Sequence, residues 1–187
     1  MTDPKVEANL WSAVTLLEEL SIPYALVGAL TLGVYGQGRA TRDADLLIDG
    51  LPETLTTLRS HVGRLGFSVD EAWLQSNPGI SDTHLRLMRH GIPVDLMLPR
   101  DEHDRSACKR RIERRFGKRS LWVVAPEDFI LQKIKAGRPR DFDDVIPFFT
   151  EHREQLDHEY LNEWARRLGV REELDYLWSQ SERPAQP

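Results

Sequence analysis

The sequence predicts an α+β fold in which helices flank a mixed β-sheet, and three observations lead to this prediction. Two segments, residues 83–89 and 92–98, flank His90-Gly91, a two-residue connection typical of a β-hairpin. The last third of the chain, from Pro126 to about Trp178, has a helical pattern that is broken near Gly137 and near Gly169. Near the N-terminus, apolar residues recur at helical spacing: Val6, Leu10, Ala13, Leu17 and Leu20.

The remaining elements follow from local patterns along the chain. Asp3-Pro4 opens the first helix, because proline is well placed at the first helical position. Apolar runs and turn residues predict strands at 24–28, 45–49 and 121–124, and a short one at 67–69. We expect helices at residues 29–35, 52–65 and 101–116, and a loop at 75–81.

Length and composition predict one core domain with a helical appendage. We expect residues 1–125 to form the core, residues 126–180 to form a C-terminal helical region packed on it, and residues 181–187 to form a flexible tail. The chain of 187 residues is 40% hydrophobic and 29% charged, as in soluble globular proteins. No apolar run is long enough to cross a bilayer, no secretory signal is recognisable, and Cys108 is the only cysteine, so we expect a cytoplasmic protein without a membrane partner.

Asp43 and Asp45 are the first candidate functional residues. They stand one residue apart at the start of an apolar run, and in a strand such residues point to the same side. Two carboxylates on one face repel each other unless a cation lies between them. The pair therefore predicts a metal site, although a polar turn before a strand is the simpler alternative.

A third carboxylate is placed by the predicted hairpin. Asp95 is a single acid on the polar side of an otherwise apolar strand. Asp95 is a candidate metal ligand, and the alternative is that it forms a structural ion pair with Arg86. The two-residue turn predicts these facing pairs: Leu85 with Leu96, Leu87 with Val94, and Arg86 with Asp95.

Three such acids suit Mg²⁺, which binds a few carboxylates and fills its other positions with water and phosphate oxygens. Two ions about 4 Å apart can activate an attacking hydroxyl and stabilise the leaving pyrophosphate. Gly28-Ala29, at the end of a strand and the start of a helix, offers backbone amides to an anion. Arg39 and Arg42 are chemically suited to a triphosphate, or they are simply loop charges. Together these parts describe nucleotidyl transfer from a nucleoside triphosphate. The six histidines show no metal-ligand spacing, so none is assigned a role.

The motifs also carry a family resemblance. Leu-Val-Gly-Ala at 26–29, Arg-x-Thr-x-Asp-x-Asp-Leu at 39–46 and the later strand aspartate resemble the minimal nucleotidyltransferase fold of the DNA polymerase β superfamily. Residues 126–144 contain Lys-x-x-Ala and Arg-x-x-Asp-x-x-Asp, similar to motifs of the AbiEii-type toxin nucleotidyltransferases and their uncharacterised relatives. Two positions depart from the family pattern: Ala29 replaces the usual second Gly or Ser, and Gln132 replaces Glu.

The resemblance implies a role for each matching residue. Asp43 and Asp45 would bind both metal ions, and Asp95 would bind the catalytic ion and help to activate the acceptor hydroxyl. Lys133 would contact phosphate and Asp141 would organise the site or act as a base. Alternatively, Lys133 is simply a solvated residue on the surface of a helix. Asp141 and Asp143 follow Pro139, and their alternative role is to complement the positive end of the helix dipole.

The acceptor is open to three interpretations. Toxin relatives modify the tRNA acceptor end and are held in check by an antitoxin. Although the net charge is −5, an RNA acceptor would fit the basic residues Arg105, Lys109, Arg110, Arg111, Arg114, Arg115, Lys118 and Arg119. An antibiotic-type small-molecule acceptor would fit an acidic wall made of Glu151, Glu154, Asp157, Glu159 and Glu163. A catalytically inert nucleotide-binding module is the third interpretation.

Overall fold

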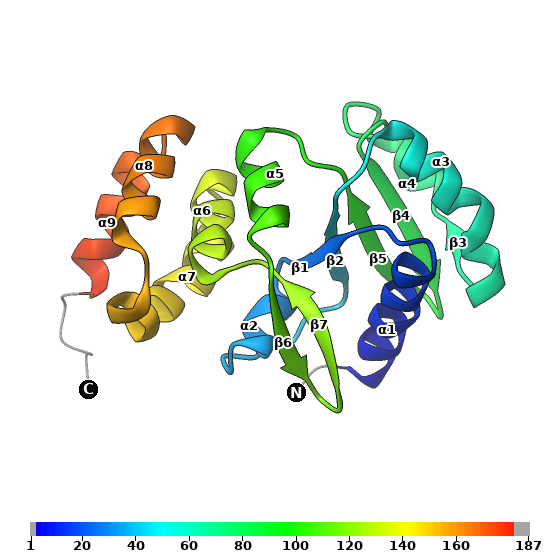
Figure 1. The fold of residues 1–187 in the computed structure, drawn as a ribbon, viewed down its shortest axis with the longest axis horizontal. Coiled ribbons are helices and arrows are strands. Elements are labelled where there is room, and N and C mark those ends of the chain that lie inside the picture. The colour runs from blue at the N-terminus through cyan, green and yellow to red at the C-terminus, as the bar shows by residue number, and fades with distance from the viewer. Residues whose placement is uncertain (1–2, 182–187) are drawn as a thin grey trace. The chain divides into compact units, whose positions relative to one another are not determined.

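The computed structural model describes residues 3–181, and the chain divides into two compact units, residues 1–124 and 125–187 (Figure 1). The helices of the first unit are α1 (Pro4–Glu19), α2 (Leu30–Val34), α3 (Pro52–His61), the 3₁₀ turn η1 (Val62–Leu65), α4 (Glu71–Ser76) and α5 (Glu102–Lys109). Its strands are β1 (Tyr24–Val27), β2 (Ala44–Ile48), β3 (Ser68–Val69), β4 (His84–Arg89), β5 (Ile92–Met97), β6 (Ile112–Phe116) and β7 (Arg119–Val123).

The strands of the first unit form one mixed sheet in the order β3-β4-β5-β2-β1-β7-β6. β2 runs antiparallel to β1 and parallel to β5, and β1 runs parallel to β7. The predicted α+β fold with a mixed sheet flanked by helices is therefore confirmed. The neighbouring strands β5, β2 and β1 lie inside the sheet, and Asp95 is on β5, Asp45 is on β2 and Gly28 directly follows β1.

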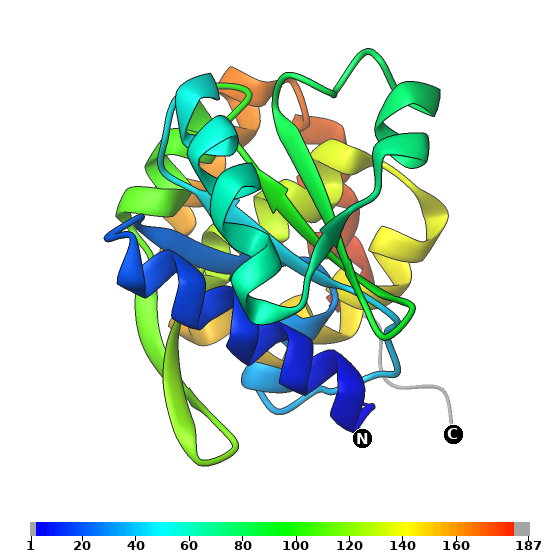
Figure 2. The ribbon, with the colours of Figure 1, turned by 90° about the vertical axis from the view of Figure 1, so that its right-hand side faces the viewer.

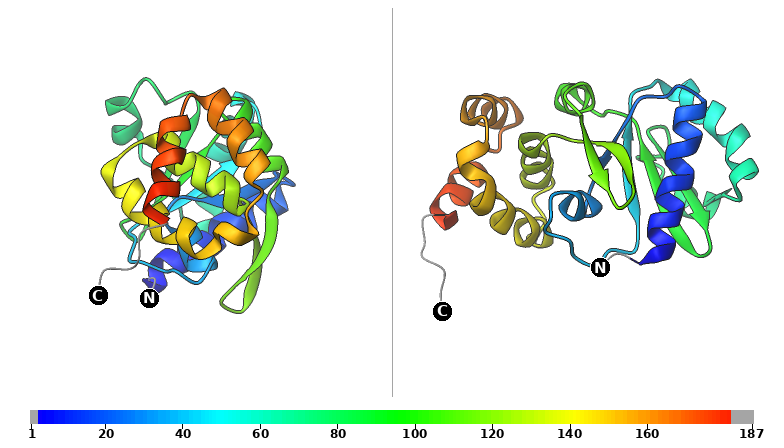
Figure 3. Two further views of the ribbon diagram at one scale, coloured as in Figure 1. Left: turned by 90° about the vertical axis from the view of Figure 1, so that its left-hand side faces the viewer. Right: turned by 60° about the horizontal axis from the view of Figure 1, so that its bottom comes forward.

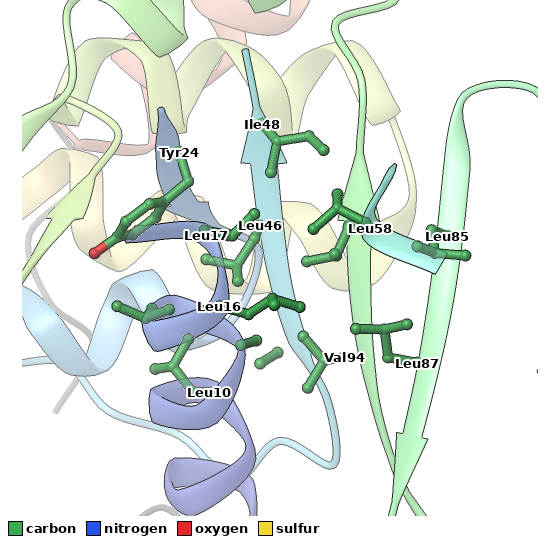
Figure 4. Packing of buried hydrophobic residues seen from close by; sticks show 14 of the residues in the cluster. Leu10, Leu16, Leu17, Tyr24, Leu46, Ile48, Leu58, Leu85, Leu87 and Val94 are labelled. Carbon is green, nitrogen blue, oxygen red and sulfur yellow. The ribbon is translucent and has the colours of Figure 1, made fainter. Parts of the chain in front are cut away.

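One face of the sheet is buried under α1 and α3 (Figure 2). Figure 4 shows Leu10 and Leu17 of α1 and Leu58 of α3 with side chains from β2, β4 and β5, all of them fully buried. Burial of this many large apolar groups supplies the main stabilisation of the unit. Because side chains alternate along a strand, the residues between these core positions point to the opposite face of the sheet.

The predicted hairpin register is confirmed. β4 and β5 pair antiparallel, and Arg86 lies opposite Asp95. The leucine pairs that the turn predicted are also present, with Leu85 opposite Leu96 and Leu87 opposite Val94. His90 and Gly91, the two turn residues, both have positive φ angles, as a type I′ turn requires.

The prediction of one helix over residues 101–116 is wrong. The helix α5 ends at Lys109, and residues 112–116 form β6, which pairs with β7 around Gly117-Lys118. Gly117 has a φ angle of +62°, which favours glycine at this two-residue turn. The charged residues of β6 are good helix formers, but pairing with β7 outweighs their helix propensity.

The loop predicted at residues 75–81 is wrong at its start, because α4 extends to Ser76. The side chain of Asp70 caps this short helix by accepting a hydrogen bond of 3.0 Å from the backbone N–H of Trp73. The other elements predicted in the first unit are present, with ends that differ by a few residues.

The second unit is helical, as predicted for residues 126–178, but it also has an interruption between His152 and His158 that the sequence pattern did not predict. Gly137 and Gly169 end two of its helices in the left-handed conformation. No helix among residues 3–181 is long and apolar enough to span a membrane. Of the predicted tail 181–187, all but Ser181 lies outside the described residues. The elements are α6 (Pro126–Ala136), α7 (Pro139–His152), the 3₁₀ turn η2 (Arg153–Gln155), α8 (His158–Leu168) and α9 (Arg171–Ser181).

Candidate active site

Strands β2 and β5 bring two of the three predicted metal ligands side by side. Asp45 and Asp95 are register partners in this parallel pair. Both point away from the face that α1 and α3 cover, because Leu46 and Leu96 beside them belong to the core. Asp43 comes two residues before Asp45, just ahead of β2. Asp43 and Asp45 are partly exposed and Asp95 is buried.

The turn after β1 lies in contact with Asp45. Gly28 has a φ angle of +68°, and a Cβ at this position would lie 2.0 Å from Oδ2 of Asp45. Glycine is therefore required for two separate reasons, the backbone conformation and the space that the carboxylate occupies. The predicted phosphate-binding turn and the predicted metal ligand are thus in direct contact.

The Arg-x-Thr-x-Asp segment holds the first acid in place. The hydroxyl of Thr41 donates a hydrogen bond of 2.6 Å to Oδ1 of Asp43. Arg39 donates to the carbonyl oxygen of Ala40 at 3.1 Å, and Arg42 is exposed. Ala29 is the N-cap of α2, which has only five residues, so any anion there would depend mainly on the backbone amides themselves.

Asp95 forms an ion pair with Arg86, which is the alternative to metal binding that the hairpin register allowed. Arg86 donates from Nε to Oδ1 at 2.8 Å and from its terminal nitrogen to Oδ2 at 2.6 Å, a bidentate pair. The guanidinium stacks 4.1 Å from the ring centroid of Trp73. The hydrogen bond to Asp95 and the charges of Asp95 and Asp43 raise the pKa of Arg86 despite its partial burial. Arg86 is therefore held firmly across both oxygens of Asp95.

A close set of metal-ligand atoms occurs elsewhere in the first unit. Asp101, His103 and Asp104, at the start of α5, offer ligand atoms within 4.8 Å of one another, and no other such set of three occurs among residues 3–181. The set is compatible with a metal ion. Its two acids also serve the helix, because Asp101 accepts from the backbone N–H of Asp104 and Asp104 accepts from that of Arg100. Sequence reasoning missed His103, for which an Asp-x-His-Asp pattern at a helix start was the only signal.

In the second unit, Lys133 lies in a buried cluster. Its Nζ donates to Oδ1 of Asp141 at 2.9 Å and to Oδ2 of Asp144 at 2.7 Å. Arg138 adds a hydrogen bond of 2.6 Å to Oδ2 of Asp141. Lys133 is on α6 and both acids are on α7, so the cluster joins the two helices. This geometry gives a structural role to the lysine of the Lys-x-x-Ala motif and to the charged residues of the Arg-x-x-Asp-x-x-Asp motif. Roles for Lys133 and Asp141 in phosphate binding or catalysis stay predictions.

The cluster also changes the acidity of Asp141. Burial alone would raise the pKa of this carboxyl, but the hydrogen bonds and charges of Arg138 and Lys133 outweigh burial and hold the pKa below its usual value. Asp141 is therefore ionised at neutral pH, as the ion pairs require.

Four of the eight basic residues considered for RNA binding lie on a β-ribbon, and the other four are on α5 or directly after it. Figure 2 shows β6 and β7 as a hairpin that extends beyond the other strands of the sheet. The exposed basic residues Arg114, Arg115, Lys118 and Arg119 are on its strands and turn, and Arg111 stacks 5.0 Å from the ring centroid of Trp122, which is 39% exposed. Arg119 is also 4.3 Å from the ring centroid of Trp11 on α1.

The acidic residues proposed as a wall for a cationic substrate have mixed roles. Asp157 caps α8 by accepting from the backbone N–H of Tyr160, and Glu163 pairs with Arg167 at 3.6 Å. Glu151, Glu154 and Glu159 are exposed on α7, η2 and α8.

The fold of the chain is shared with nucleotidyltransferases of known structure. No protein-family model and no curated protein matches the sequence. The solution structure of the antibiotic-resistance factor ANT(2'')-Ia is similar to this chain with a TM-score of 0.61 at 13% identity, over 89% of this chain and 95% of that chain.

Two further solved structures are similar. A crystal structure of ANT(2'')-Ia in complex with adenylyl-2''-tobramycin has a TM-score of 0.53 at 19% identity, over 93% of this chain and 95% of that one. A candidate nucleotidyltransferase from Thermotoga maritima, TM1012, has a TM-score of 0.52 at 15% identity, over 81% and 96%. At these identities the comparisons show the fold, and the AbiEii-type assignment stays a prediction.

Proposed function

We propose that this protein is a Mg²⁺-dependent nucleotidyltransferase that moves a nucleoside monophosphate from a nucleoside triphosphate to an acceptor hydroxyl. The observation that carries the proposal is the contact between Gly28 and Asp45, beside Asp95 on the neighbouring strand. It places a turn without a side chain against a pair of acids, which is the arrangement that a triphosphate and its cations need.

The residues fit a hard divalent cation. Asp43, Asp45 and Asp95 provide only oxygen ligands, and glycine at position 28 leaves room for the Asp45 carboxylate beside the turn. When bound, the cations would polarise the α-phosphate and stabilise the pyrophosphate that leaves. In the proposed reaction the acceptor oxygen attacks the α-phosphorus, and the bond to the bridging oxygen of pyrophosphate breaks.

The chain's own side chains would position the reactants. Thr41 orients Asp43, and the backbone amides of Gly28 and Ala29 would bind phosphate oxygens, with Arg39 and Arg42 as further cationic groups. Asp95 would lie beside the acceptor hydroxyl and help to take its proton. Because Arg86 occupies both oxygens of Asp95, this role requires Arg86 to release at least one of them.

For the acceptor we propose RNA, with tRNA as the first candidate. The support is the β6–β7 hairpin, whose exposed arginines and lysine would bind phosphates and whose Trp122 would stack on a base. A protein that blocks tRNA in this way would act as a toxin, and its host would need an antitoxin to survive. The support for that last step is the motif resemblance of residues 126–144.

The experiment is a transfer assay with purified protein, Mg²⁺, each α-³²P-labelled nucleoside triphosphate and total tRNA. The variants are Asp43→Asn/Asp45→Asn and, as a matched control, Asp49→Asn, which removes an exposed acid just after β2. We expect label on tRNA with the wild type and Asp49→Asn, and a loss of roughly 1,000-fold or more with the double variant, since metal assistance contributes several kcal/mol.

Other outcomes would redirect the proposal. Transfer to an aminoglycoside and not to tRNA would replace RNA by a small-molecule acceptor. Mg²⁺-dependent binding of triphosphate without transfer to any acceptor would favour the interpretation that the protein is a catalytically inert nucleotide-binding module. Equal activity of the double variant and the wild type would contradict the proposed site.

A further inference from the structure

A hollow in the second unit belongs to none of the groups described above. It lies between α7 and α9, which pack side by side (Figure 3), and has a volume of about 480 Å³. Pro139, Phe142, Ile146 and Tyr176 form its apolar lining. This volume is within the range of small-molecule sites, roughly 300–1,000 Å³.

Two aromatic rings form the centre of the lining. Phe142 of α7 and Tyr176 of α9 meet edge to face, with ring centroids 5.8 Å apart and planes at 77°. Tyr176 is 47% exposed, so a large part of its ring area faces solvent. Exposed aromatic faces attract cations through the ring quadrupole, and Tyr and Phe both act in this way.

Three acids, Asp143, Glu172 and Glu173, complete the lining. Within residues 3–181, none of the three side chains takes part in a hydrogen bond or an ion pair. Glu172 and Glu173 are in the first turn of α9, where the helix dipole favours an acid, but this does not account for Asp143 on the other helix. Asp143 and Glu172 are exposed and Glu173 is partly exposed, so the three carboxylates give the rim of the hollow a negative charge that attracts cations.

Other acids on the same two helices behave differently. Asp141 and Asp144 of α7 pair with Lys133, and Asp175 of α9 pairs with Arg171 at 2.9 Å. The basic partners of these acids, Lys133 and Arg171, are not among the residues that line the hollow. The three acids of the hollow are set apart from this pattern.

We propose that the hollow between α7 and α9 binds a small organic cation, an amine whose ammonium groups are carried on an apolar chain or ring. The apolar body would lie on Phe142 and Tyr176, and the ammonium groups would pair with the carboxylates of the two helices. The site needs neither nucleotide nor divalent cation, so it stands independently of the proposed transfer reaction.

The test is a titration of the full chain, in the presence of EDTA, with 1,6-diaminohexane and with the neutral 1,6-hexanediol. Binding is followed by calorimetry and by amide chemical shifts. We expect the diamine to bind at least tenfold more tightly than the diol, with shifts concentrated on α7 and α9. The variant Glu172→Gln/Glu173→Gln should bind it about tenfold more weakly.

The control variant is Glu154→Gln/Glu159→Gln, which removes the same charge from exposed positions of the same unit. It should bind the diamine as the wild type does. Equal weakening in both variants would overturn the proposal, because the attraction would then come from net charge alone. Comparable binding of the diol, or shifts spread over other acidic surfaces, would overturn it as well.

Discussion

Each of the two units contains carboxylates beside a basic side chain, and the two groups differ in what holds them. In the second unit, Lys133 and Arg138 satisfy Asp141 and Asp144 inside a buried cluster between α6 and α7. In the first unit, Asp43 and Asp45 stay partly exposed at the start of a strand, and only Asp95 is buried, against Arg86. The comparison teaches that aspartate motifs of similar appearance can differ in environment: one group is buried and paired between two helices, and the other, which we propose binds cations, keeps two of its acids partly exposed.

The largest effect on stability should come from Lys133. The variant Lys133→Met leaves two buried carboxylates without their shared cation, so we expect the free energy of unfolding to fall by about 3–5 kcal/mol. Urea denaturation measures this change, with Lys135→Met, at a partly exposed position of the same helix, as the control. Adding Asp141→Asn and Asp144→Asn to Lys133→Met should recover much of the loss. Unchanged stability of Lys133→Met, together with weaker triphosphate binding, would favour the phosphate-contact role instead.

The next effect concerns Gly28. Alanine there would take a left-handed conformation, which costs about 1–2 kcal/mol, and would also push the Asp45 carboxylate away. Gly91→Ala is the matched control, since Gly91 has a φ angle of +72° and open space around it. We expect both variants to lose stability in thermal denaturation, but only Gly28→Ala to lose nucleotidyl transfer. Full activity of Gly28→Ala would show that the turn and Asp45 do not act together.

Arg86 offers a smaller effect on cation binding. Because Arg86 covers both oxygens of Asp95, Arg86→Gln should bind Mn²⁺ about tenfold more tightly, as measured by electron paramagnetic resonance. Arg89→Gln serves as the control, since Arg89 is on the same strand but donates to the hydroxyl of Ser12. If Mn²⁺ affinity instead falls in Arg86→Gln, Arg86 supports the metal site rather than competing with the metal.

The smallest effect is a pH dependence in the second unit. The folded-state pKa of Asp141 is below its unfolded value of 3.8, so its ion pairs contribute stability that is fully present above that value. The contribution should disappear as the pH falls below 3.8 and through the lower folded-state pKa. Denaturation curves at pH 7, 5 and 3 would therefore show that the stability difference between wild type and Asp141→Asn shrinks only at pH 3. A constant difference at all three pH values would contradict the assigned ion pairs.

Sequence patterns predicted the hairpin and its polar pair well, because a two-residue turn leaves only one register that puts the leucines on one face. The same reasoning missed β6, because its charged residues do not form a strand-like pattern and Gly117-Lys118 was the only turn signal. The partners of Lys133 were beyond prediction, since a lysine within a helix motif does not indicate which carboxylates fold against it. Contacts between side chains from different elements depend on packing, which local patterns do not contain.

The most direct test compares the loss of one acid from each of the two groups. Asp45→Asn and Asp141→Asn each remove one charge, and both proteins are examined for Mg²⁺-dependent binding of nucleoside triphosphate by calorimetry and for stability in urea. We predict that Asp45→Asn loses the Mg²⁺-dependent binding and keeps its stability, whereas Asp141→Asn keeps the binding and loses stability. The reverse pattern, or loss of binding in both variants with stability unchanged, would contradict it.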